Sequence, residues 1–470
     1  MLSDFIKNKF LEHFSHVPTH DQEFVFSQLS DFINSSSEVF ILKGYAGTGK
    51  TSLLSSLTHT LQEIKIPVVL MAPTGRAAKV LSQYTQKPAY TIHKTIYKQV
   101  SQGDSQRFNL YFNSLSRAIF IIDEASMLAN SSGERSIFGS GNLIDDVFSY
   151  IFGTPKDCKL ILVGDDAQLP PVGLSESPAL QQKFIEQSYL RTTVLHTLEN
   201  VVRQDEQSMI LETATRIRSL LQENTITFPQ INPAEDVERI TGDILIEKIE
   251  SSYNSVGTEH TIIITRSNKY ANIYNKGIRS MVLWRDSRIS AGDYVMIVKN
   301  NYFWTETLKT IDFIANGDIA EIVSIQNYEE LYGFSFATVT LRFPDYNNEE
   351  IDAKILLDTL DSESPALPFE DNKRFFETVQ EDYVDIKNKR TRYQEMKKNP
   401  YFNALQIKFA YAVTCHKAQG GQWKHVYVDH GYMPEESISH DFLRWLYTAC
   451  TRATEKLFLV NFKKEFFEQE

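Results

Sequence analysis

The sequence predicts an α/β protein with two groups of buried strands and a small β-rich segment inside the second group. The main observation is a set of short runs of consecutive apolar residues, many of them closely followed by Gly, Asp or Thr. Consecutive apolar residues indicate burial on both faces, as in a parallel sheet that helices cover. The runs are Val39–Leu42, Val68–Met71, Ala118–Ile122, Lys159–Val163, Thr261–Thr265, His425–Val428 and Leu457–Val460.

Helical segments between the runs, such as Ser52–Ile64 and Gly75–Gln83, complete the βαβ order of an α/β protein. The first four runs lie before about residue 190, and the other three lie after about residue 260. We therefore expect a first domain over 1–190 and a second domain that combines 191–291 with 405–470.

The pattern changes between Gly292 and Ala404, where polar and apolar residues alternate instead of running together. The stretches DYVMIVK, DIAEIVSI and ATVTLRF show this alternation most clearly. Alternation indicates strands with one buried and one solvated face, which is typical of antiparallel sheets. We expect residues 292–404 to form a small β-rich insert in the second domain.

Length and composition fit a soluble protein with several domains. The chain has 470 residues, 42% of them apolar and 23% charged, and at roughly 100–200 residues per domain this suggests two to four domains. No apolar run approaches the length of a membrane span, and the N-terminus lacks the continuous apolar core of a signal peptide. The three cysteines form no C-x-x-C pair, which favours a reducing cytosol over a disulfide framework or a zinc site.

The charge balance argues against a protein that coats nucleic acid. There are 60 acidic residues against 48 Lys and Arg, and the formal net charge of −12 contrasts with the basic charge usual for such proteins. Net charge does not describe local charge, and Lys387–Lys398 is rich in basic residues. This stretch fits either a solvated helix face or a contact with phosphates.

Residues 44–51 read Gly-Tyr-Ala-Gly-Thr-Gly-Lys-Thr, which matches G-x-x-x-x-G-K-[ST] completely and lies between a predicted strand and a predicted helix. Glycines let the backbone wrap so that its N–H groups face phosphates, and the helix adds its positive N-terminal end. Lys50 can reach the β- and γ-phosphates of ATP, and the Thr51 hydroxyl can ligate Mg²⁺. The predicted nucleotide-binding residues of this P-loop are Gly44, Ala46, Gly47, Thr48, Gly49, Lys50, Thr51 and Ser52.

Asp123 and Glu124 close the predicted strand Ala118–Ile122. A carboxylate at the C-terminal end of a strand beside a P-loop is placed to ligate Mg²⁺, and we assign this role to Asp123. We expect Glu124 to polarise the attacking water, because a general base must lie within hydrogen-bond reach of it. An isolated Asp-Glu pair can also be only a helix start, so the assignment depends on the neighbouring P-loop.

Three further polar residues complete the predicted catalytic set. Gln168 follows the strand Lys159–Val163, and a glutamine can orient a water or sense a γ-phosphate without adding charge. Arg203 and Arg452 can place a cation on the charge that develops during phosphoryl transfer. Both arginines fall in the second domain, so we expect a site shared by two domains that opens and closes during hydrolysis. On spacing alone, Gln168 fits a polar loop stiffened by prolines, and each arginine fits a surface ion pair.

Ten motifs follow one another in order along the chain. They are GYAGTGKT at 44, APTGRAAKVL at 72, TIHKTIY at 91, IIDEASM at 121, GDDAQLPPVG at 164, VVRQ at 201, TRSN at 265, ANGDIAEI at 315, AYAVTCHKAQG at 410 and YTACTRATEKL at 447. The series resembles the superfamily 1B DNA helicases, in the RecD-like and Dda-like group. GDxxQLPPV and HKAQG are its most discriminating elements, and the match from Gln22 to Arg452 spans nearly the whole chain.

The resemblance implies two RecA-like P-loop NTPase domains with ATP between them and an SH3-like fold for the β-rich insert. It implies single-stranded DNA and duplex junctions as partners and movement in the 5′-to-3′ direction, and we expect the protein to work as a monomer. Gln22 would read the adenine. The residues that would line the single-strand track are Pro73, Thr74, Thr91, His93, Ser267, Asn268, Thr414 and His416.

The track residues also make physical sense. Thr, Ser, Asn and His present neutral donors to phosphates, so each contact can be broken at every step without a deep electrostatic trap. Proline and aromatic faces can stack on bases with little sequence preference. Outside their motifs, His93 and His416 would be better explained as satisfied core histidines.

A short hairpin insert is expected near 84–117, with its tip at Gln102–Asp104. In close relatives a hairpin at this place separates the strands of the duplex, and Phe108 or Tyr111 could act as the wedge. An ordinary surface hairpin fits the sequence equally well.

Two other functions remain open for the whole chain. One is a P-loop ATPase that acts as a regulatory switch without unwinding. The other is an RNA helicase, since neutral phosphate contacts do not exclude a 2′-hydroxyl.

Overall fold

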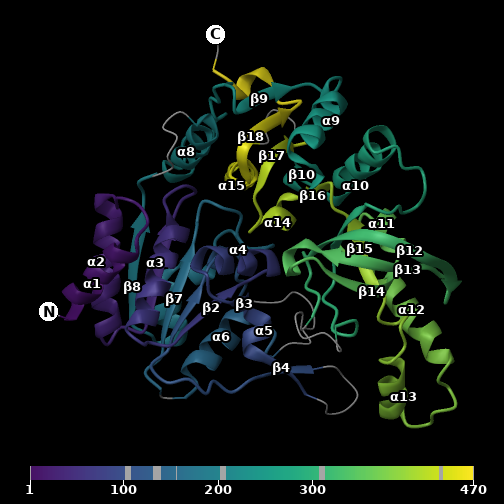
Figure 1. Cartoon of the computed structure of the whole chain (residues 1–470), viewed down its shortest axis with the longest axis horizontal. Coiled ribbons are helices and arrows are strands. Elements are labelled where there is room, and N and C mark those ends of the chain that lie inside the picture. The colour runs from purple at the N-terminus through teal and green to yellow at the C-terminus, as the bar shows by residue number, and fades with distance from the viewer. Residues whose placement is uncertain are drawn as a thin grey trace. The chain divides into compact units, whose positions relative to one another are not determined.

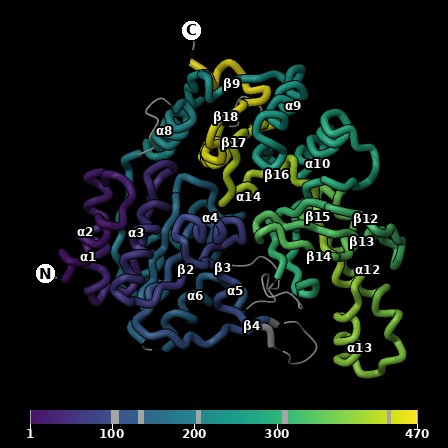
Figure 2. Tube along the Cα trace, in the orientation of Figure 1, coloured from purple at the N-terminus to yellow at the C-terminus, as the bar shows by residue number. Residues whose placement is uncertain are grey.

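The computed structural model describes residues 2–100, 107–130, 139–154, 156–201, 208–305, 313–432 and 438–468. These residues form two compact units. The first takes the described residues up to Ile226 together with Ser439–Thr448, and the second takes those from Thr227 to Ile438 and from Ala449 onward. Figures 1 and 2 follow the chain from its N-terminus in purple to its C-terminus in yellow.

The first unit is built on a parallel sheet of six strands in the order β3-β2-β6-β7-β1-β8. The four central strands are the predicted apolar runs and are almost completely buried, which confirms the α/β class. The edge strands β3 and β8 are more exposed and lack a long apolar run. The expected domain limit at residue 190 falls before β8, which pairs with β1. The strands are β1 (Val39–Gly44), β2 (Val68–Ala72), β3 (Ala89–Thr91), β6 (Ile119–Ile122), β7 (Lys159–Gly164) and β8 (Thr193–Leu198).

Helices follow the strands of this sheet in the expected alternation (Figure 1). The two N-terminal helices add an aromatic layer, in which the ring centre of Phe26 lies 5.4 Å from Phe10 and 5.2 Å from Phe14. This layer belongs to the same hydrophobic core as β1 and α3. The helices are α1 (Leu2–His13), α2 (His20–Asn34), α3 (Lys50–Glu63), α4 (Gly75–Thr85), α5 (Ile92–Ile96), α6 (Leu143–Phe152), α7 (Gln182–Tyr189) and α8 (Met209–Gln222), with short 3-10 turns at Ala125–Met127 and Pro178–Leu180.

An antiparallel hairpin of β4 (Tyr97–Val100) and β5 (Arg107–Leu110) belongs to the first unit. Its predicted tip at Gln102–Asp104 lies outside the described residues. Phe108 is only 6% exposed, whereas Tyr111 is 43% exposed. Of the two candidate wedge residues, Phe108 therefore packs inside the protein, and Tyr111 is the one that solvent reaches.

The second unit contains a parallel sheet of five strands in the order β16-β10-β17-β18-β9. The three predicted runs after residue 260 form its central strands, β10, β17 and β18. The strands are β9 (Val237–Ile240), β10 (Thr261–Thr265), β16 (Ala412–Thr414), β17 (Trp423–Asp429) and β18 (Ala453–Val460). The helices around them are α9 (Leu245–Val256), α10 (Asn268–Gly277) and α14 (Cys415–Ala418), with short turns at Thr258–His260, Ile278–Val282 and Lys464–Phe466, and α15 (His440–Cys450) supplies residues to both units.

A closed barrel confirms the β-rich part of the fold class. Four of its strands lie in the predicted segment 292–404, and the fifth, β15, follows that segment directly. Neighbouring strands are antiparallel except for β14 and β15, which run parallel and close the barrel. The strands are β11 (Tyr294–Ile297), β12 (Ile319–Leu331), β13 (Phe334–Phe343), β14 (Glu349–Leu356) and β15 (Leu405–Phe409). Only Ala410 and Tyr411 separate β15 from β16 of the parallel sheet, and one hydrophobic core runs through both.

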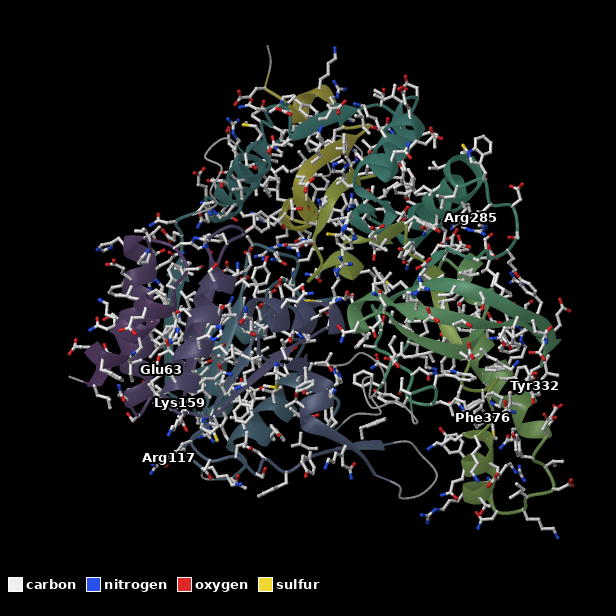
Figure 3. The ribbon with its side chains drawn as sticks, viewed as in Figure 1. Glu63, Arg117, Lys159, Arg285, Tyr332 and Phe376 are labelled. Carbon is white, nitrogen blue, oxygen red and sulfur yellow. The ribbon has the colours of Figure 1, made fainter. Side chains whose placement is uncertain are left out.

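Helices interrupt the barrel between β14 and β15, where the sequence predicts a β-rich insert and, at Lys387–Lys398, either a solvated helix face or a phosphate contact. They are α11 (Asp358–Asp361), α12 (Phe369–Glu381) and α13 (Lys389–Met396). An aromatic cluster around Phe375 holds α12 against β13 and is separate from the barrel core. Figure 3 labels Tyr332 and Phe376, which pack against this cluster. The basic stretch Lys387–Lys398 forms α13 and its flanks, and Arg392 donates there to the carbonyl oxygens of Val384 and Ile386.

Two chemical expectations can be checked against the fold. Among the described helices, none is long and apolar enough to cross a membrane. Cys158, Cys415 and Cys450 are free thiols, and all three are buried. Cys415 starts α14 beneath the surface, and burial raises the pKa of its thiol to about 12.

Candidate nucleotide and nucleic-acid sites

The P-loop of the first unit connects the end of β1 to the start of α3, as the motif requires. Gly47 and Gly49 have φ angles of 80° and 82°, a left-handed region that side chains disfavour. A Cβ atom at Gly49 would also lie 2.5 Å from the amide nitrogen of Gln22. The backbone conformation therefore favours glycine at position 49, and a larger residue would also displace the Gln22 side-chain amide.

In this structure the Lys50 side chain bonds to the backbone of its own loop. Its Nζ donates to the carbonyl oxygens of Gly44 at 2.5 Å and Tyr45 at 2.8 Å. The Thr48 hydroxyl donates to the same Tyr45 carbonyl at 2.9 Å. A bound phosphate would compete with these internal acceptors for the lysine.

Gln22 is buried beside the P-loop, at the start of α2. Its Nε2 donates to the carbonyl oxygen of Thr48 at 3.0 Å, and its Oε1 accepts the N–H of Thr19 at 3.1 Å. The Thr19 hydroxyl in turn accepts a hydrogen bond from the Gln22 N–H, so the pair forms a capping box for α2. The side chain predicted to read adenine thus joins the helix start to the P-loop.

Asp123 and Glu124 follow β6, which lies two strands from β1 in the sheet. Burial and the neighbouring Glu124 raise the pKa of the Asp123 carboxyl, while the Glu124 N–H bond and the charge of Lys50 oppose the shift. Asp123 accepts this N–H bond at 2.9 Å. Glu124 has a φ of 52°, a strained conformation that aims its side chain differently from a regular strand.

Gln168 lies in the loop after β7, between β6 and β1 in the sheet. The side chain is 4% exposed, and its Nε2 lies 3.5 Å from Oδ2 of Asp165. Its Oε1 is buried and has no hydrogen-bond partner within the described part of the chain. A buried acceptor without a partner is costly, so this atom is poised to accept from a water or ligand.

Only one of the two predicted arginines lies among the described residues. Arg203 lies outside the described residues. Arg452 belongs to the second unit and is 5% exposed. Its guanidinium donates to the carbonyl oxygen of Gly421 at 3.3 Å and to the Thr451 hydroxyl at 3.1 Å. The first unit by itself therefore brings together Lys50, Asp123, Glu124 and Gln168 at the ends of three adjacent strands.

The predicted track residues of the first unit lie at the starts of two helices. Thr74 caps α4 by accepting the Ala77 N–H at 3.2 Å, and Thr91 caps α5 by accepting the Lys94 N–H at 3.2 Å. Burial lowers the pKa of His93 to about 4, so this ring is neutral at physiological pH. Pro73 directly precedes Thr74 and is half-buried.

In the second unit, Ser267 caps α10 by accepting the Tyr270 N–H at 3.3 Å. Thr414 precedes α14 and makes no capping bond with its side chain, and His416 is exposed on that helix. Asn268 and Thr414 line the same pocket. The sequence did not predict that these two residues lie together. Its other lining residues are Ala271, Asn272, Asn275, Met296, Val298, Pro365, Lys408, Phe409, Ala412, Val413 and Lys417.

Lys408 and Lys417 are the two cations of this pocket. Burial lowers the pKa of each to about 8. Lys408 Nζ donates to the carbonyl oxygens of Thr359, at 3.0 Å, and Ser362, and Lys417 Nζ donates to Oδ1 of Asn316 at 2.5 Å. The available signals were a lysine between two apolar residues in LQIKF and a lysine inside HKAQG.

Two family models match separate parts of the chain. Residues 26–230 match a family described as an AAA domain, and residues 409–460 match a UvrD-like helicase C-terminal domain. A crystal structure of Pif1 helicase from Bacteroides in complex with ADP-AlF3 and ssDNA has a similar fold. Its TM-score is 0.51 at 16% identity, and the match covers 97% of this chain and 95% of that one.

Three curated relatives are similar in sequence. The uncharacterized protein R530 of Acanthamoeba polyphaga mimivirus is 25% identical, over 93% of this chain and 98% of its own length. The ATP-dependent DNA helicase Pif1 of Psychrobacter sp. is 24% identical, over 83% of this chain and 61% of its own length. The ATP-dependent DNA helicase dda of Enterobacteria phage T4 is 23% identical, over 59% of this chain and 60% of its own length. The ordered motifs, the matched domain families and the relatives make the chain similar to the superfamily 1B DNA helicases, in the RecD-like and Dda-like group.

Proposed function

We propose that the chain is an ATP-dependent helicase that moves along single-stranded DNA in the 5′-to-3′ direction and unwinds duplex DNA. The observation that carries the proposal is the placement of Lys50, Asp123 and Gln168 at the ends of three adjacent strands. The named relatives, two of which are DNA helicases, support DNA rather than RNA as the substrate.

The ATPase roles follow from chemistry. Lys50 would exchange its bonds to the Gly44 and Tyr45 carbonyls for bonds to the β- and γ-phosphates. Glu124 would hold the attacking water as general base, and the unpartnered Oε1 of Gln168 would accept a hydrogen bond from that water. Arg203 and Arg452 would stabilise charge on the transferred phosphoryl group.

Mg²⁺ fits the oxygen donors at this edge of the sheet. We propose Thr51 and Asp123 as its protein ligands, since hydroxyl and carboxylate oxygens suit this cation. The raised pKa of Asp123 reflects a buried carboxyl beside a second one, a setting that a divalent cation would relieve. When bound, the cation would neutralise charge on the phosphates.

The pocket of the second unit supports a DNA track there. Asn268 and Thr414, predicted from sequence, line this pocket together with two lysines. Burial lowers the pKa of both lysines. A weakly held positive charge suits a contact that is made and released at each step. The buried free thiols support a reducing compartment, and we propose that the protein works there as a monomer.

A test of this function uses two duplexes with the same paired segment, one with a 5′ single-stranded tail and one with a 3′ tail. We expect ATP-dependent unwinding of the 5′-tailed duplex and turnover that single-stranded DNA stimulates. Lys50→Ala should abolish both, because it removes the group that reaches the phosphates.

Three outcomes would contradict parts of the proposal. Unwinding of the 3′-tailed duplex alone would reverse the direction. DNA-stimulated turnover without unwinding of either duplex would favour a regulatory ATPase. Stronger stimulation by RNA of the same length and base order would favour an RNA helicase.

A further inference from the structure

Tyr447 of α15 connects two loops of the first unit, and none of the roles above uses it. Its phenol oxygen accepts the backbone N–H of Ala46 in the P-loop at 2.9 Å. The same hydroxyl donates to Oδ2 of Asp165, in the loop that carries Gln168, at 2.7 Å. Tyr447 is 1% exposed and Asp165 is fully buried. One hydroxyl thus satisfies a buried amide and a buried carboxyl at the same time.

The rest of α15 is fitted to the Gln168 loop. The Leu169 N–H donates to the Thr448 hydroxyl at 2.8 Å, and the Arg444 guanidinium donates to the carbonyl oxygen of Asp166. All of these residues belong to the first unit. The helix therefore holds this loop at several points and reaches the P-loop through the phenol.

The local charges keep the phenol a neutral donor. Burial and the Asp165 carboxyl raise the pKa of Tyr447 well above its usual value. Burial also raises the pKa of Asp165, whereas the charge of Lys50 acts in the opposite direction. The bridge therefore lies within the field of the lysine that is expected to bind phosphate.

We propose that Tyr447 is a positioning residue of the phosphate site, whose hydroxyl fixes the Ala46 amide in the cradle of P-loop N–H groups and ties that cradle to α15. The inference rests on the proposed role of the P-loop as the ATP site. α15 continues into Ala449 and Cys450 of the second unit, and Arg452 follows in the chain. The hydroxyl is thus a point where the nucleotide loop is joined to the segment that bears a proposed catalytic arginine.

The neighbouring Tyr45 offers a matched control. Its hydroxyl accepts from Nε2 of Gln222 at 2.7 Å, and the guanidinium of Arg218 lies 4.3 Å from its ring centre. These contacts join Tyr45 to α8 through side chains and do not involve the backbone N–H groups of the P-loop. Tyr45→Phe therefore removes one hydroxyl from the same loop without removing the acceptor of a P-loop N–H.

The experiment compares Tyr447→Phe with Tyr45→Phe in the full chain, without DNA. Titration with a fluorescent ADP analogue and steady-state ATP hydrolysis give Kd, KM and kcat. Loss of one buried, charge-assisted hydrogen-bond bridge should raise Kd and KM by about tenfold in Tyr447→Phe. We expect kcat at saturating ATP to change by less than about threefold, and Tyr45→Phe to stay within about twofold of the wild type in all three constants.

The result that overturns the proposal is a Kd and KM for Tyr447→Phe within twofold of those of Tyr45→Phe. A purely structural role would lower the melting temperature but leave nucleotide affinity unchanged well below it, and this also counts against the proposal. If Tyr447→Phe does not fold, Asp165→Asn weakens the same bridge from its other side, and an unchanged Kd in that variant is equally decisive.

The test separates this inference from the proposed function. Suppose that Tyr447→Phe binds nucleotide weakly and that the wild type shows no DNA-stimulated turnover. These results together would contradict the helicase function and would still support the positioning role of Tyr447.

Discussion

Asp318 shows how a single buried carboxyl makes stability depend on pH. It lies in the motif ANGDIAEI, and its Oδ2 accepts from the Ala315 N–H at 2.7 Å and the Tyr346 hydroxyl at 2.9 Å. Burial raises its pKa to about 7, because two hydrogen bonds do not replace the lost hydration, and the nearby Asp345 adds to the shift.

The sign of the effect follows from this raised pKa. The folded state holds the Asp318 proton more tightly than the unfolded chain, whose pKa is about 3.9. The resulting stability is fully present below the unfolded value and is lost as the pH rises through about 7.

We expect Asp318→Asn to be more stable than the wild type at pH 8, by on the order of 1–3 kcal/mol, and to differ little at pH 4. The amide keeps an oxygen for both donors and carries no charge to bury. Thermal or urea unfolding across this pH range measures the difference. Asp352→Asn, an exposed carboxyl on β14, is the control and should show no such trend. Parallel pH profiles for wild type and Asp318→Asn would refute the assignment.

At the scale of elements, the pocket built by α10, β11, β15, β16 and α14 is where two lysines and two proposed track residues meet. Lys408→Met and Lys417→Gln should each weaken binding of single-stranded DNA by roughly 3–10-fold and lower the salt slope of the affinity by about one. Anisotropy titrations at several salt concentrations measure both quantities. Because burial lowers both pKa values to about 8, the wild-type slope should also fall as the pH rises through 8.

Lys424→Gln is the matched control for this pocket. Lys424 lies on β17 of the same unit, has a side chain that is 43% exposed, and pairs with Glu455 at 2.9 Å. The Lys424→Gln substitution removes an equal charge at a site outside the pocket lining. A loss of affinity as large as that of the pocket variants would mean that general charge, and not the pocket, holds the strand.

The elements that sequence predicted are those with a strong local signal. Buried parallel strands read as consecutive apolar residues, and the P-loop reads as a fixed order of glycines, Lys50 and Thr51. Edge strands such as β3 and β8 carry no such run, because solvent reaches one side of them. The helix α12 was missed because Phe375 packs on β13 and Phe376 packs on Tyr393 of α13, contacts that only the fold reveals.

The candidate site was predictable in part for the same reason. Motif order located Asp123 and Gln168, but it could not show that Oε1 of Gln168 is left without a partner among the described residues. Lys408 was hidden in a buried strand, since its proposed role depends on Lys417, which lies 9 residues later in the chain on α14. The hydroxyl of Tyr447 meets Ala46 across 401 residues, beyond any local pattern.

At the scale of the whole molecule, the net charge of −12 limits how the protein meets DNA. An acidic surface repels phosphates, so contact should be confined to the track. We expect a blunt duplex without a tail to bind at least about 100-fold more weakly than single-stranded DNA at roughly 0.15 M salt. Competition between the two for a labelled single strand measures the ratio. Equal competition would mean that an extended surface, and not a narrow track, provides the affinity.

The short link between β15 and β16 has a mechanical consequence for such a motor. Tyr411 in this link shares its hydroxyl with Asp293, Arg285 and the Tyr294 N–H, and Figure 3 labels Arg285. Two residues leave almost no slack, so a pull on Thr414 at the end of β16 would pass straight into the barrel wall. The barrel and the edge of the sheet that bears the proposed track residue Thr414 would then move as one stiff lever, and little of the work of each step would be lost in stretching the protein.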